Sequence, residues 1–349
     1  MKDNFQSPWP NLRLYARDCG EIDPYNAANT ELFRGEEAFA PAVEGWERWS
    51  KPSPEPRLDA EFEPILLDSI AHQAPQINAM ARALAAKIVA ANADKPPVLI
   101  AILRAGAPIC ALLAPILSEH YSEPIAVCAF SMFYGLGWDE TALAQIIADY
   151  PNHTPIFVDG WTSGGGVARQ IALSFAQWKA SGKPDFTDGK APQFAVLCDP
   201  RGVATYSAIR ADFPVPSAAF TAPETLGFSR GFAREDGGLF GVYRFPKSQL
   251  KPLWIEAWLD VLNAEVTSLP PDDLPATVPA PDGFRVHVNE VTRALINRDP
   301  LEIWLRPTEA KARETLAPLL YHANKRGVPV EFGRDELANW GALAVARMK

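Results

Sequence analysis

The sequence predicts an α/β protein built around a mainly parallel sheet, followed by a smaller α/β domain. Apolar strand-like runs alternate with helix-like segments, and a proline-rich stretch separates them from a basic tail. The strand-like runs are PVLIAIL (97–103), PIAVCAF (124–130), PIFVDG (155–160) and QFAVLCD (193–199). Strands that are apolar throughout are typical of parallel sheets, which helices cover on both faces.

Apolar residues at helical spacing mark the segments before and between these strands. Residues 65–92 follow this spacing, and Pro75 predicts a break or a helix start within them. Further helices are expected in APICALLAPILSEHY, DETALAQIIADY and GVARQIALSFAQWKASG, which follow the first three strands. The first 60 residues are rich in proline and aromatic residues, and within them LRLYARD suggests a strand.

The segment SLPPDDLPATVPAPDG (268–283) has five prolines between Pro270 and Pro281 and predicts a stiff, extended linker. It divides the chain into an N-terminal extension (1–60), a main domain (61–267) and a C-terminal domain (284–349). In the C-terminal domain we expect a strand at LEIWLR, a helix at TEAKARETLAPLLYHANKRG, a strand at VPVEF and a final helix at RDELANWGALAVARM.

Composition argues against several classes of protein. No apolar run approaches the roughly 20 residues of a membrane-spanning helix, and no signal-peptide pattern opens the sequence, so we expect a cytoplasmic protein. The four cysteines have no C-x-x-C spacing and only five histidines accompany them, which argues against a zinc site or a disulfide framework. Net charge is −9, yet residues 284–349 carry 11 Lys/Arg against 8 Asp/Glu, which suggests a separate role for the tail.

The stretch TPIFVDGWTSGGGVARQI predicts an anion-binding turn between a strand and a helix. Asp159 ends the strand, at the sheet edge where α/β proteins bind ligands. Glycines let backbone N–H groups approach a ligand closely, and the helix adds the partial positive charge of its N-terminus. Val167 and Arg169 stand where a Walker A loop and a dinucleotide fingerprint need Ser/Thr and Gly. A tight turn without a ligand is the alternative.

A second turn of this kind occurs in IAILRAGAPICALLAPIL. Arg104 stands at the carboxyl end of the strand, where its guanidinium can hold an anion with two hydrogen bonds. Gly106 lets the neighbouring N–H groups turn inward. A surface arginine in an ordinary turn is the alternative for this motif alone, but two anion-binding turns on neighbouring strands favour one shared ligand site.

Together, LRAG and VDGWTSGGGV resemble the pyrophosphate and 5-phosphate loops of type I phosphoribosyltransferases. VLCDPRGVA and VPSAAFTAPETLGFSRGF resemble a narrower StiP-like branch, often found with bacterial tellurite-resistance and stress-response genes. The tail PLEIWLRPTEAKARETLAPLLYHANKRGVPVEF resembles a Pelota-type RNA-binding domain. The resemblance covers about residues 60–265 and 284–349 and implies the type I phosphoribosyltransferase fold for the main domain.

The resemblance implies transfer of a phosphoribosyl group from 5-phosphoribosyl 1-diphosphate to an acceptor base that the sequence does not identify. Asp159 would accept hydrogen bonds from ribose hydroxyls, and Arg104 would contact pyrophosphate. The other substrate-binding residues would be Ala105, Gly106, Gly160, Thr162, Ser163, Gly164, Gly165 and Gly166. Mg2+, held largely by phosphate oxygens and waters, would neutralise the leaving group. Most type I enzymes have a second acidic residue where this chain has Gly160.

Other site residues are assigned with alternatives. Asp199, at the end of the next strand, would face the acceptor or a metal-bound water, or else cap a turn. Asp139 lies in FSMFYGLGWDETALAQI, which stands where the family has a mobile flap; it would cap the following helix or, as second choice, reach the metal. Arg230 would line the acceptor pocket, whereas Arg234 suits an exposed ion pair. The N-terminal extension would help to form the hood over the acceptor.

The resemblance also implies partners. RNA would bind through residues 284–349, and a homodimer is expected because the family often forms dimers. The basic residues available to RNA are Arg293, Arg298, Arg306, Lys311, Arg313, Lys325, Arg326 and Arg334. A tail with a purely structural or protein-contacting role is the alternative.

Two other functions compete with the transferase. One is a non-catalytic sensor of phosphoribosyl diphosphate, nucleotide or RNA, which the missing second carboxylate favours. The other is a cysteine protease, since StiP-like relatives sometimes carry that name. Cys110 falls in an apolar helix pattern and Cys198 in a buried-looking strand, so both are better explained as small core residues than as nucleophiles.

Overall fold

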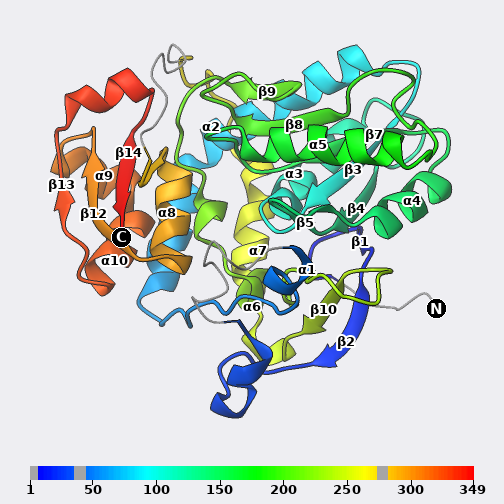
Figure 1. Ribbon diagram of the computed structural model, residues 1–349. Helices are drawn as coiled ribbons and strands as arrows, with labels where there is room; N and C mark the ends of the chain where they lie inside the picture. Colours follow the sequence, from blue (N-terminus) through cyan, green and yellow to red (C-terminus); the bar gives the residue numbers. More distant parts are fainter. Residues whose placement is uncertain (1–6, 35–44, 273–281) are drawn as a thin grey trace.

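The computed structural model describes residues 7–34, 45–272 and 282–349, and its centre is a six-stranded parallel sheet (Figure 1). The strand order is β1-β4-β3-β7-β8-β9 and every neighbouring pair is parallel. The strands are β1 (Leu12–Leu14), β3 (Pro97–Ile102), β4 (Ala126–Phe130), β7 (Thr154–Val158), β8 (Gln193–Cys198) and β9 (Tyr206–Ile209). The predicted α/β class and parallel sheet are therefore confirmed.

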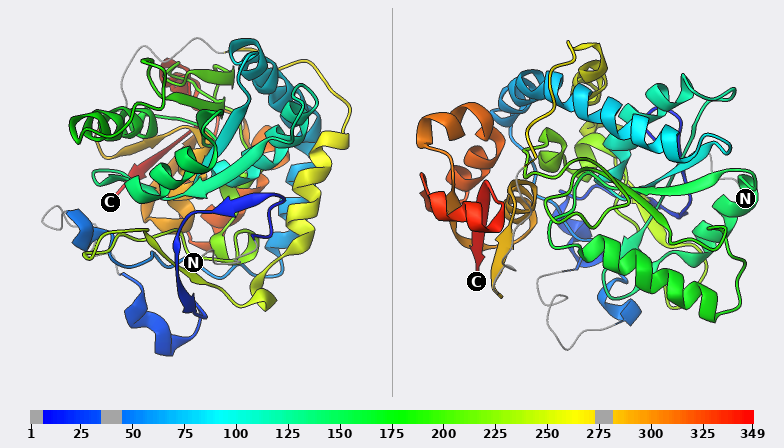
Figure 2. Two further views of the ribbon diagram at one scale, coloured as in Figure 1. Left: turned by 90° about the vertical axis from the view of Figure 1, so that its right-hand side faces the viewer. Right: turned by 90° about the horizontal axis from the view of Figure 1, so that it is seen from above.

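Alternate residues of the central strands enter two separate cores. In β3, Leu99 and Ala101 join a core with α2 (Phe62–Ala91), α3 (Gly106–Ser118) and α7 (Pro252–Leu259). Val98 and Ile100 join the other core, with α4 (Glu140–Asp149) and α5 (Gly166–Ala180). Figure 2 shows α2 and α5 on opposite sides of the sheet. Every residue of β3 is buried because both faces are covered, as the uniformly apolar strand predicts.

The helix α2 runs through Pro75 without a break, so the predicted interruption is wrong. A proline inside a helix removes one backbone hydrogen bond. Here buried residues continue on both sides of it, from Leu66 and Ile70 to Ile77 and Leu84. Packing of this face against the rest of the main domain outweighs the local penalty.

The N-terminal extension adds β2 (Arg17–Glu21), which pairs with β10 (Gly241–Arg244) outside the main sheet. The predicted strand LRLYARD is thus divided between β1 and the start of β2. The remaining short elements of this part are η1 (Ala27–Leu32), α1 (Gly45–Arg48), β5 (Met132–Phe133), β6 (Gly137–Trp138), η3 (Pro216–Ala219), α6 (Ala222–Thr225), η4 (Lys247–Gln249) and η5 (Asp260–Asn263).

A second sheet, of order β11-β14-β12-β13, forms within the C-terminal residues. Its elements are β11 (Phe284–Val286), α8 (Val288–Asn297), β12 (Pro300–Leu305), α9 (Glu309–Thr315), α10 (Ala317–Lys325), β13 (Val330–Glu331), η6 (Asp335–Trp340) and β14 (Ala344–Met348). Of the proposed linker, residues 273–281 lie outside the described residues. The helix α8 was not predicted from the sequence.

Two predictions for the C-terminal domain are wrong. The single helix expected at 308–327 is divided into α9 and α10, because Pro318 stands in the first turn of a new helix. The expected final helix is a short 3-10 turn that ends at Gly341, with φ +59°, followed by the strand β14. The run from Ala342 to Ala346 is almost entirely buried between β11 and β12, and such a short apolar run fits strand and helix equally well from sequence alone.

The C-terminal domain lies against the main domain through α8 and α10, and Figure 1 shows α8 beside the centre of the molecule. Asp212 is buried at this boundary, where its carboxylate accepts hydrogen bonds from the N–H groups of Val288 (2.9 Å) and Leu343 (2.8 Å). No helix in the described ranges is long and apolar enough to cross a membrane.

We predict that Asp212→Ala lowers the free energy of unfolding by about 2–4 kcal/mol, because a buried and a partly buried N–H group lose their acceptor. Urea denaturation at pH 8 measures the effect. The control is Asp94→Ala, at an exposed residue, which should change the value by less than about 0.5 kcal/mol. Equal midpoints for the two variants would contradict the role assigned to Asp212.

Candidate functional site

The turns after β3 and β7 are in direct contact. A Cβ atom at Gly106 would lie 2.1 Å from the carbonyl oxygen of Val158, and one at Gly160 would lie 3.5 Å from the Cβ of Ala105. In the sheet, β4 lies on one side of β3, and β7, the next parallel strand in the chain, lies on the other. The strand order therefore reverses at β3. Ligands of open α/β sheets bind in the crevice beyond such a reversal.

A cavity of about 290 Å³ opens at this junction and is lined by five arginines, so we call it the arginine cavity. The turns contribute Arg104, Ala105, Asp159 and Trp161. Arg230 comes from the segment after α6, and Trp9 comes from the N-terminal extension. The C-terminal domain supplies Arg285, Glu290, Arg293, Ala294, Asn297 and Arg298. Such a concentration of guanidinium groups favours a ligand with several negative charges.

Asp159 directly follows the C-terminal end of β7 and lines this cavity. Its Oδ1 accepts a hydrogen bond from the N–H of Gly160 (2.8 Å). Burial raises the pKa of its carboxyl to about 7, and the nearby charge of Glu290 acts in the same direction. The Gly160 hydrogen bond and Arg230 oppose the shift. A carboxyl with such a raised pKa in a cleft is typical of a functional site.

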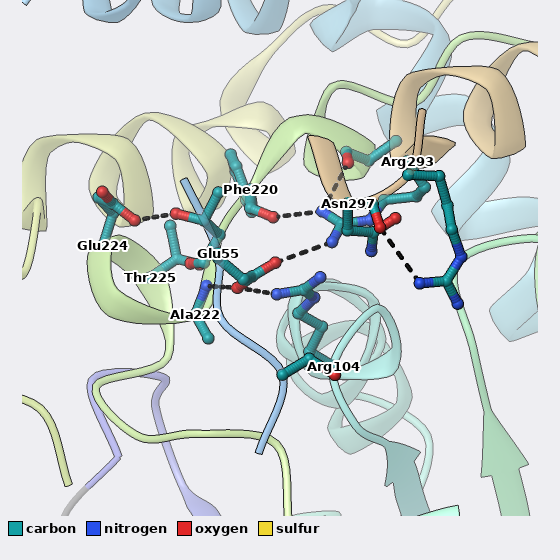
Figure 3. Close-up of polar contacts among 12 residues, drawn as sticks. Glu55, Arg104, Phe220, Ala222, Glu224, Thr225, Arg293 and Asn297 are labelled. Carbon is teal, nitrogen blue, oxygen red and sulfur yellow. Dashed lines mark hydrogen bonds and ion pairs between the residues drawn. The ribbon is translucent and has the colours of Figure 1, made fainter. Parts of the chain in front are cut away.

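Arg104 forms an ion pair with Glu55 (Figure 3). The second oxygen of that carboxylate accepts from Arg293 at 2.9 Å, and the N–H of Ala222 donates to the first at 2.6 Å. Glu55 is therefore shared by the N-terminal extension, the main domain and the C-terminal domain. The peptide bond between Leu103 and Arg104 is cis. Arg293 also donates to the carbonyls of Ala218 and Phe220, which fixes α8 against the main domain.

Arg230 makes no hydrogen bond or ion pair with the described residues. Its guanidinium lies over the rings of Phe133 (4.7 Å) and Trp49 (5.8 Å) and lines the arginine cavity. Burial, together with the neighbouring charge of Arg104, lowers its pKa to about 9. An anionic ligand would relieve both effects.

The glycine-rich turn lies next to this cavity but does not line it. Gly165 adopts φ +76° directly before α5, and the N–H groups of Gly164 and Gly165 meet no acceptor among the described residues. Thr162 is buried, with its N–H bound to the carbonyl of Cys198. These free donors at a helix N-terminus suit a phosphate group.

Ser163 faces the C-terminal domain instead. Its hydroxyl donates to the carbonyl of Val286 (2.7 Å) and lies 2.6 Å from Nδ1 of His287. Burial lowers the pKa of His287 to about 4, so its ring is neutral at neutral pH. The C-terminal domain is thus anchored to the turn that carries the predicted phosphate site.

Two predicted acidic site residues lie away from the cavity. Asp199 is buried in the turn after β8, where Oδ2 accepts from the N–H of Ala204 (2.8 Å) and Oδ1 has no partner among the described residues. Asp139 is the N-cap of α4, and its two oxygens accept from the N–H groups of Ala142 (2.9 Å) and Phe240 (2.6 Å). The structure therefore gives both residues the capping role that the sequence analysis held as the alternative for Asp199 and preferred for Asp139.

The predicted flap is a short β5–β6 hairpin held to α5, where the N–H of Gly135 donates to Gln170 (2.7 Å). Tyr134 at its tip is 61% exposed and lines a second cavity of about 600 Å³. This second cavity shares Arg104 and Arg230 with the arginine cavity and is also lined by residues 51–56 of the N-terminal extension.

No cysteine lines the arginine cavity or the second cavity. Cys110, Cys128 and Cys198 are buried. Burial raises the pKa of Cys128 to about 12 and that of Cys110 and Cys198 well above the usual range. Among the described residues no thiol is hydrogen-bonded to a histidine, which a cysteine nucleophile needs for activation.

Protein ligands for a metal are few. No cluster of three or more His, Cys, Asp or Glu side chains that could hold a metal occurs within the described ranges. Asp159 and Glu290 are the carboxylates that line the arginine cavity. Two carboxylates suit Mg2+ only when phosphate oxygens and waters supply its other ligands.

Most basic residues that the sequence offered to RNA are engaged within the protein. Arg313, Lys311 and Arg334 pair with acidic neighbours on their own domain, and Lys325 pairs with Asp59. Arg234 forms the expected exposed ion pair with Asp236.

Four residues of the site were not predicted from the sequence: Glu55, Trp161, Arg285 and Glu290. One signal was present: Glu290, Arg293 and Asn297 recur at spacings of three and four residues, which places them on one face of a helix.

The family model described as "Tellurite-like stress resistance cysteine protease StiP" matches residues 47–241. A curated relative from Acinetobacter baylyi, named Cysteine protease StiP, is 30% identical over 124 residues, or 36% of this chain and 30% of that protein. The match thus spans less than a third of the length of that curated relative.

Similar solved structures include the hypoxanthine phosphoribosyltransferase of Trypanosoma cruzi, at 15% identity and a TM-score of 0.28, covering 39% of this chain and 77% of that one. A hypoxanthine-guanine phosphoribosyltransferase from Bacillus anthracis has 19% identity and a TM-score of 0.25, with 39% and 77% covered. A hypothetical protein from Neisseria gonorrhoeae with bound ppGpp has 19% identity and a TM-score of 0.27, with 38% and 77% covered. TM-scores this low leave the roles of residues to be argued from this chain alone.

We predict that Asp159→Asn becomes more stable relative to wild type as pH rises. The carboxyl has a pKa of about 7 in the folded chain against 3.8 as its usual value, so folding binds a proton between these values. Its contribution to stability therefore falls as pH rises from about 4 to 7. Relative to wild type, the asparagine variant should gain about 1–3 kcal/mol between pH 5 and pH 8 in urea denaturation. The same difference for the exposed control Asp94→Asn would contradict the assignment.

Thiol accessibility gives a second prediction. A disulfide reagent such as DTNB should modify Cys19 readily in the native protein, since Cys19 is partly exposed. The other thiols should react at least about a hundredfold more slowly until the chain unfolds, because they are buried and protonated. Rapid modification of native Cys19→Ser would contradict this and reopen the question of a cysteine nucleophile.

Proposed function

We propose that this chain, which belongs to the StiP family, is a Mg2+-dependent phosphoribosyltransferase that uses 5-phosphoribosyl 1-diphosphate. The observation that supports the proposal best is the arginine cavity, which joins Arg104, Asp159 and Arg230 beside a glycine-rich turn with free N–H groups. A sugar carrying a phosphate at one end and a diphosphate at the other has the charges and hydroxyls that this arrangement can bind.

Each part of the site suits one part of such a ligand. The N–H groups of Gly164 and Gly165, with the N-terminus of α5, would hold the 5-phosphate. Asp159 would accept hydrogen bonds from the sugar hydroxyls. Arg104 and Arg230 would bind the diphosphate, whose charge would relieve the burial of the Arg230 guanidinium.

In the proposed reaction the bond between C1 of the sugar and the diphosphate oxygen breaks, and a bond forms between C1 and the acceptor. Negative charge grows on the departing diphosphate. The arginines are already in place before the bond breaks and would stabilise this charge. Asp159 would orient the sugar so that C1 faces the acceptor. Bound Mg2+, held mainly by phosphate oxygens and waters, would supply further charge neutralisation, and Asp159 and Glu290 are the carboxylates that line the cavity.

A non-catalytic sensor of the same ligand is the second candidate. Glu55 already pairs with Arg104, the arginine assigned to the diphosphate, and this ion pair favours a site that registers ligand by exchanging one anion for another. Tight binding without release of pyrophosphate in the presence of any base would support the sensor.

The remaining expectations have less support. The family description names a cysteine protease, but we propose no protease activity because the buried thiols line neither cavity. RNA binding by residues 284–349, a homodimer and a cytoplasmic location stay predictions from the resemblance.

We predict that the wild-type protein binds 5-phosphoribosyl 1-diphosphate with Mg2+ in isothermal titration calorimetry. Arg230→Gln should weaken binding about tenfold or more, because charged hydrogen bonds to the diphosphate are lost. Asp159→Asn should lower pyrophosphate release with a panel of bases by about a hundredfold. The control Arg313→Gln lies on α9, in an exposed ion pair away from the cavities, and should behave as wild type. Failure of the wild type to bind would refute the proposed ligand.

A further inference from the structure

The turn after β7 offers few acceptors for a sugar. Of the two oxygens of Asp159, Oδ1 is engaged by the N–H of Gly160, while Oδ2 accepts no hydrogen bond from the described residues. Gly160 itself has no side chain to contribute. A pair of neighbouring sugar hydroxyls presents two O–H donors, and this turn has no second carboxylate to share them with Asp159.

Glu290 on α8 brings a second carboxylate to the same cavity. The indole N–H of Trp161, two residues after Asp159, donates to its Oε1 at 3.0 Å. Its Oε2 accepts no hydrogen bond from the described residues. The negative charge of Glu290 helps to raise the pKa of Asp159. This agrees with two carboxylates that face the same cavity.

The position of Glu290 is fixed from both sides. Directly before α8, Val286 and His287 contact Ser163 of the glycine-rich turn. One turn further along the helix, Arg293 is bound to the carbonyls of Ala218 and Phe220. The helix that carries Glu290 is therefore held at the turn after β7 and at residues 218–220 of the main domain.

A structural role alone explains part of this arrangement. An acidic residue in the first turn of a helix is favoured by the helix dipole, and the hydrogen bond to Trp161 joins the two domains. Neither effect requires the second oxygen of Glu290 to remain free in a cavity lined by five arginines. A ligand that carries both hydroxyl donors and phosphate acceptors matches the carboxylates and the arginines together.

We propose that Glu290 is a ligand-binding residue that the C-terminal domain supplies to the main domain: its free oxygen accepts a sugar hydroxyl opposite Asp159. This inference rests on the proposed function, since it assigns a residue to the same sugar phosphate. The C-terminal domain is then one wall of the sugar site.

The test compares wild type with Glu290→Gln by isothermal titration calorimetry in the presence of Mg2+. Glutamine keeps the side-chain length and can still accept from Trp161, so the change removes charge rather than the domain contact. The probes are 5-phosphoribosyl 1-diphosphate and inorganic pyrophosphate, which has no sugar hydroxyls. The matched control is Glu309→Gln, whose side chain is exposed on α9 and pairs with Arg313.

Glu290→Gln should weaken binding of the sugar diphosphate about tenfold or more, as expected for a lost hydrogen bond to a charged group, and change binding of pyrophosphate less than about twofold. Glu309→Gln should leave both values unchanged. Equal affinity of wild type and Glu290→Gln for the sugar diphosphate, or an equal loss for both probes, would overturn the assignment to a hydroxyl. Absence of sugar-diphosphate binding by wild type would instead overturn the proposed function.

A second variant protects the test against misfolding. Trp161→Phe keeps the carboxylate but removes the N–H that orients it, so binding of the sugar diphosphate should weaken about three- to fivefold with pyrophosphate binding unchanged. If Glu290→Gln does not fold, as judged by circular dichroism, unchanged binding in Trp161→Phe would overturn the inference.

Discussion

The contact between the backbone of two turns is the constraint on which the site depends. The first turn of α3 lies so close to the end of β7 that a side chain at residue 106 would overlap the carbonyl of Val158. Glycine at this position lets the strands end side by side, and Arg104 and Asp159 therefore face the same cavity. A larger residue would have to separate β3 from β7 and would move the arginine away from the carboxylate.

Around this contact the protein buries groups of both charge signs, which disfavours their ionised forms. Burial lowers the pKa of Arg230 and raises that of Asp159, so each would be more stable in water. Glu55 and Glu290 neutralise part of the arginine charge without filling the cavity. An arrangement of this kind is stabilised when a ligand brings anions to the guanidinium groups and hydroxyls to the carboxylates. Such a ligand would therefore offset the burial of both charged groups.

Local patterns in the sequence were sufficient for the main sheet and for the two turns. The strands β3, β4, β7 and β8 are short apolar runs, and their period and boundaries depend on residues close in sequence. The sequence predicts a helix where β14 forms, because ALAVA satisfies either period, and pairing with β11 and β12 selects the strand.

The contacts that assemble the cavity could not be predicted from local patterns. Glu55 acquires its role from Arg104, about 50 residues away, and from Arg293, at the other end of the chain, and no local pattern encodes that meeting. From sequence, Arg293 is one of the basic residues available to RNA. In the structure its partners are backbone carbonyls of the main domain, which composition cannot reveal.

The ion pairs of Glu55 also have a consequence for the order in which the parts of the site form during synthesis. Domains generally fold from the N-terminal end as they are synthesised. When the last strand of the main sheet has left the ribosome, Glu55 can meet Arg104, but Arg293 and the rest of α8 have not yet been made. A growing chain thus has the floor of the cavity well before it has the opposite wall, so the ligand site is completed only once the C-terminal domain is in place.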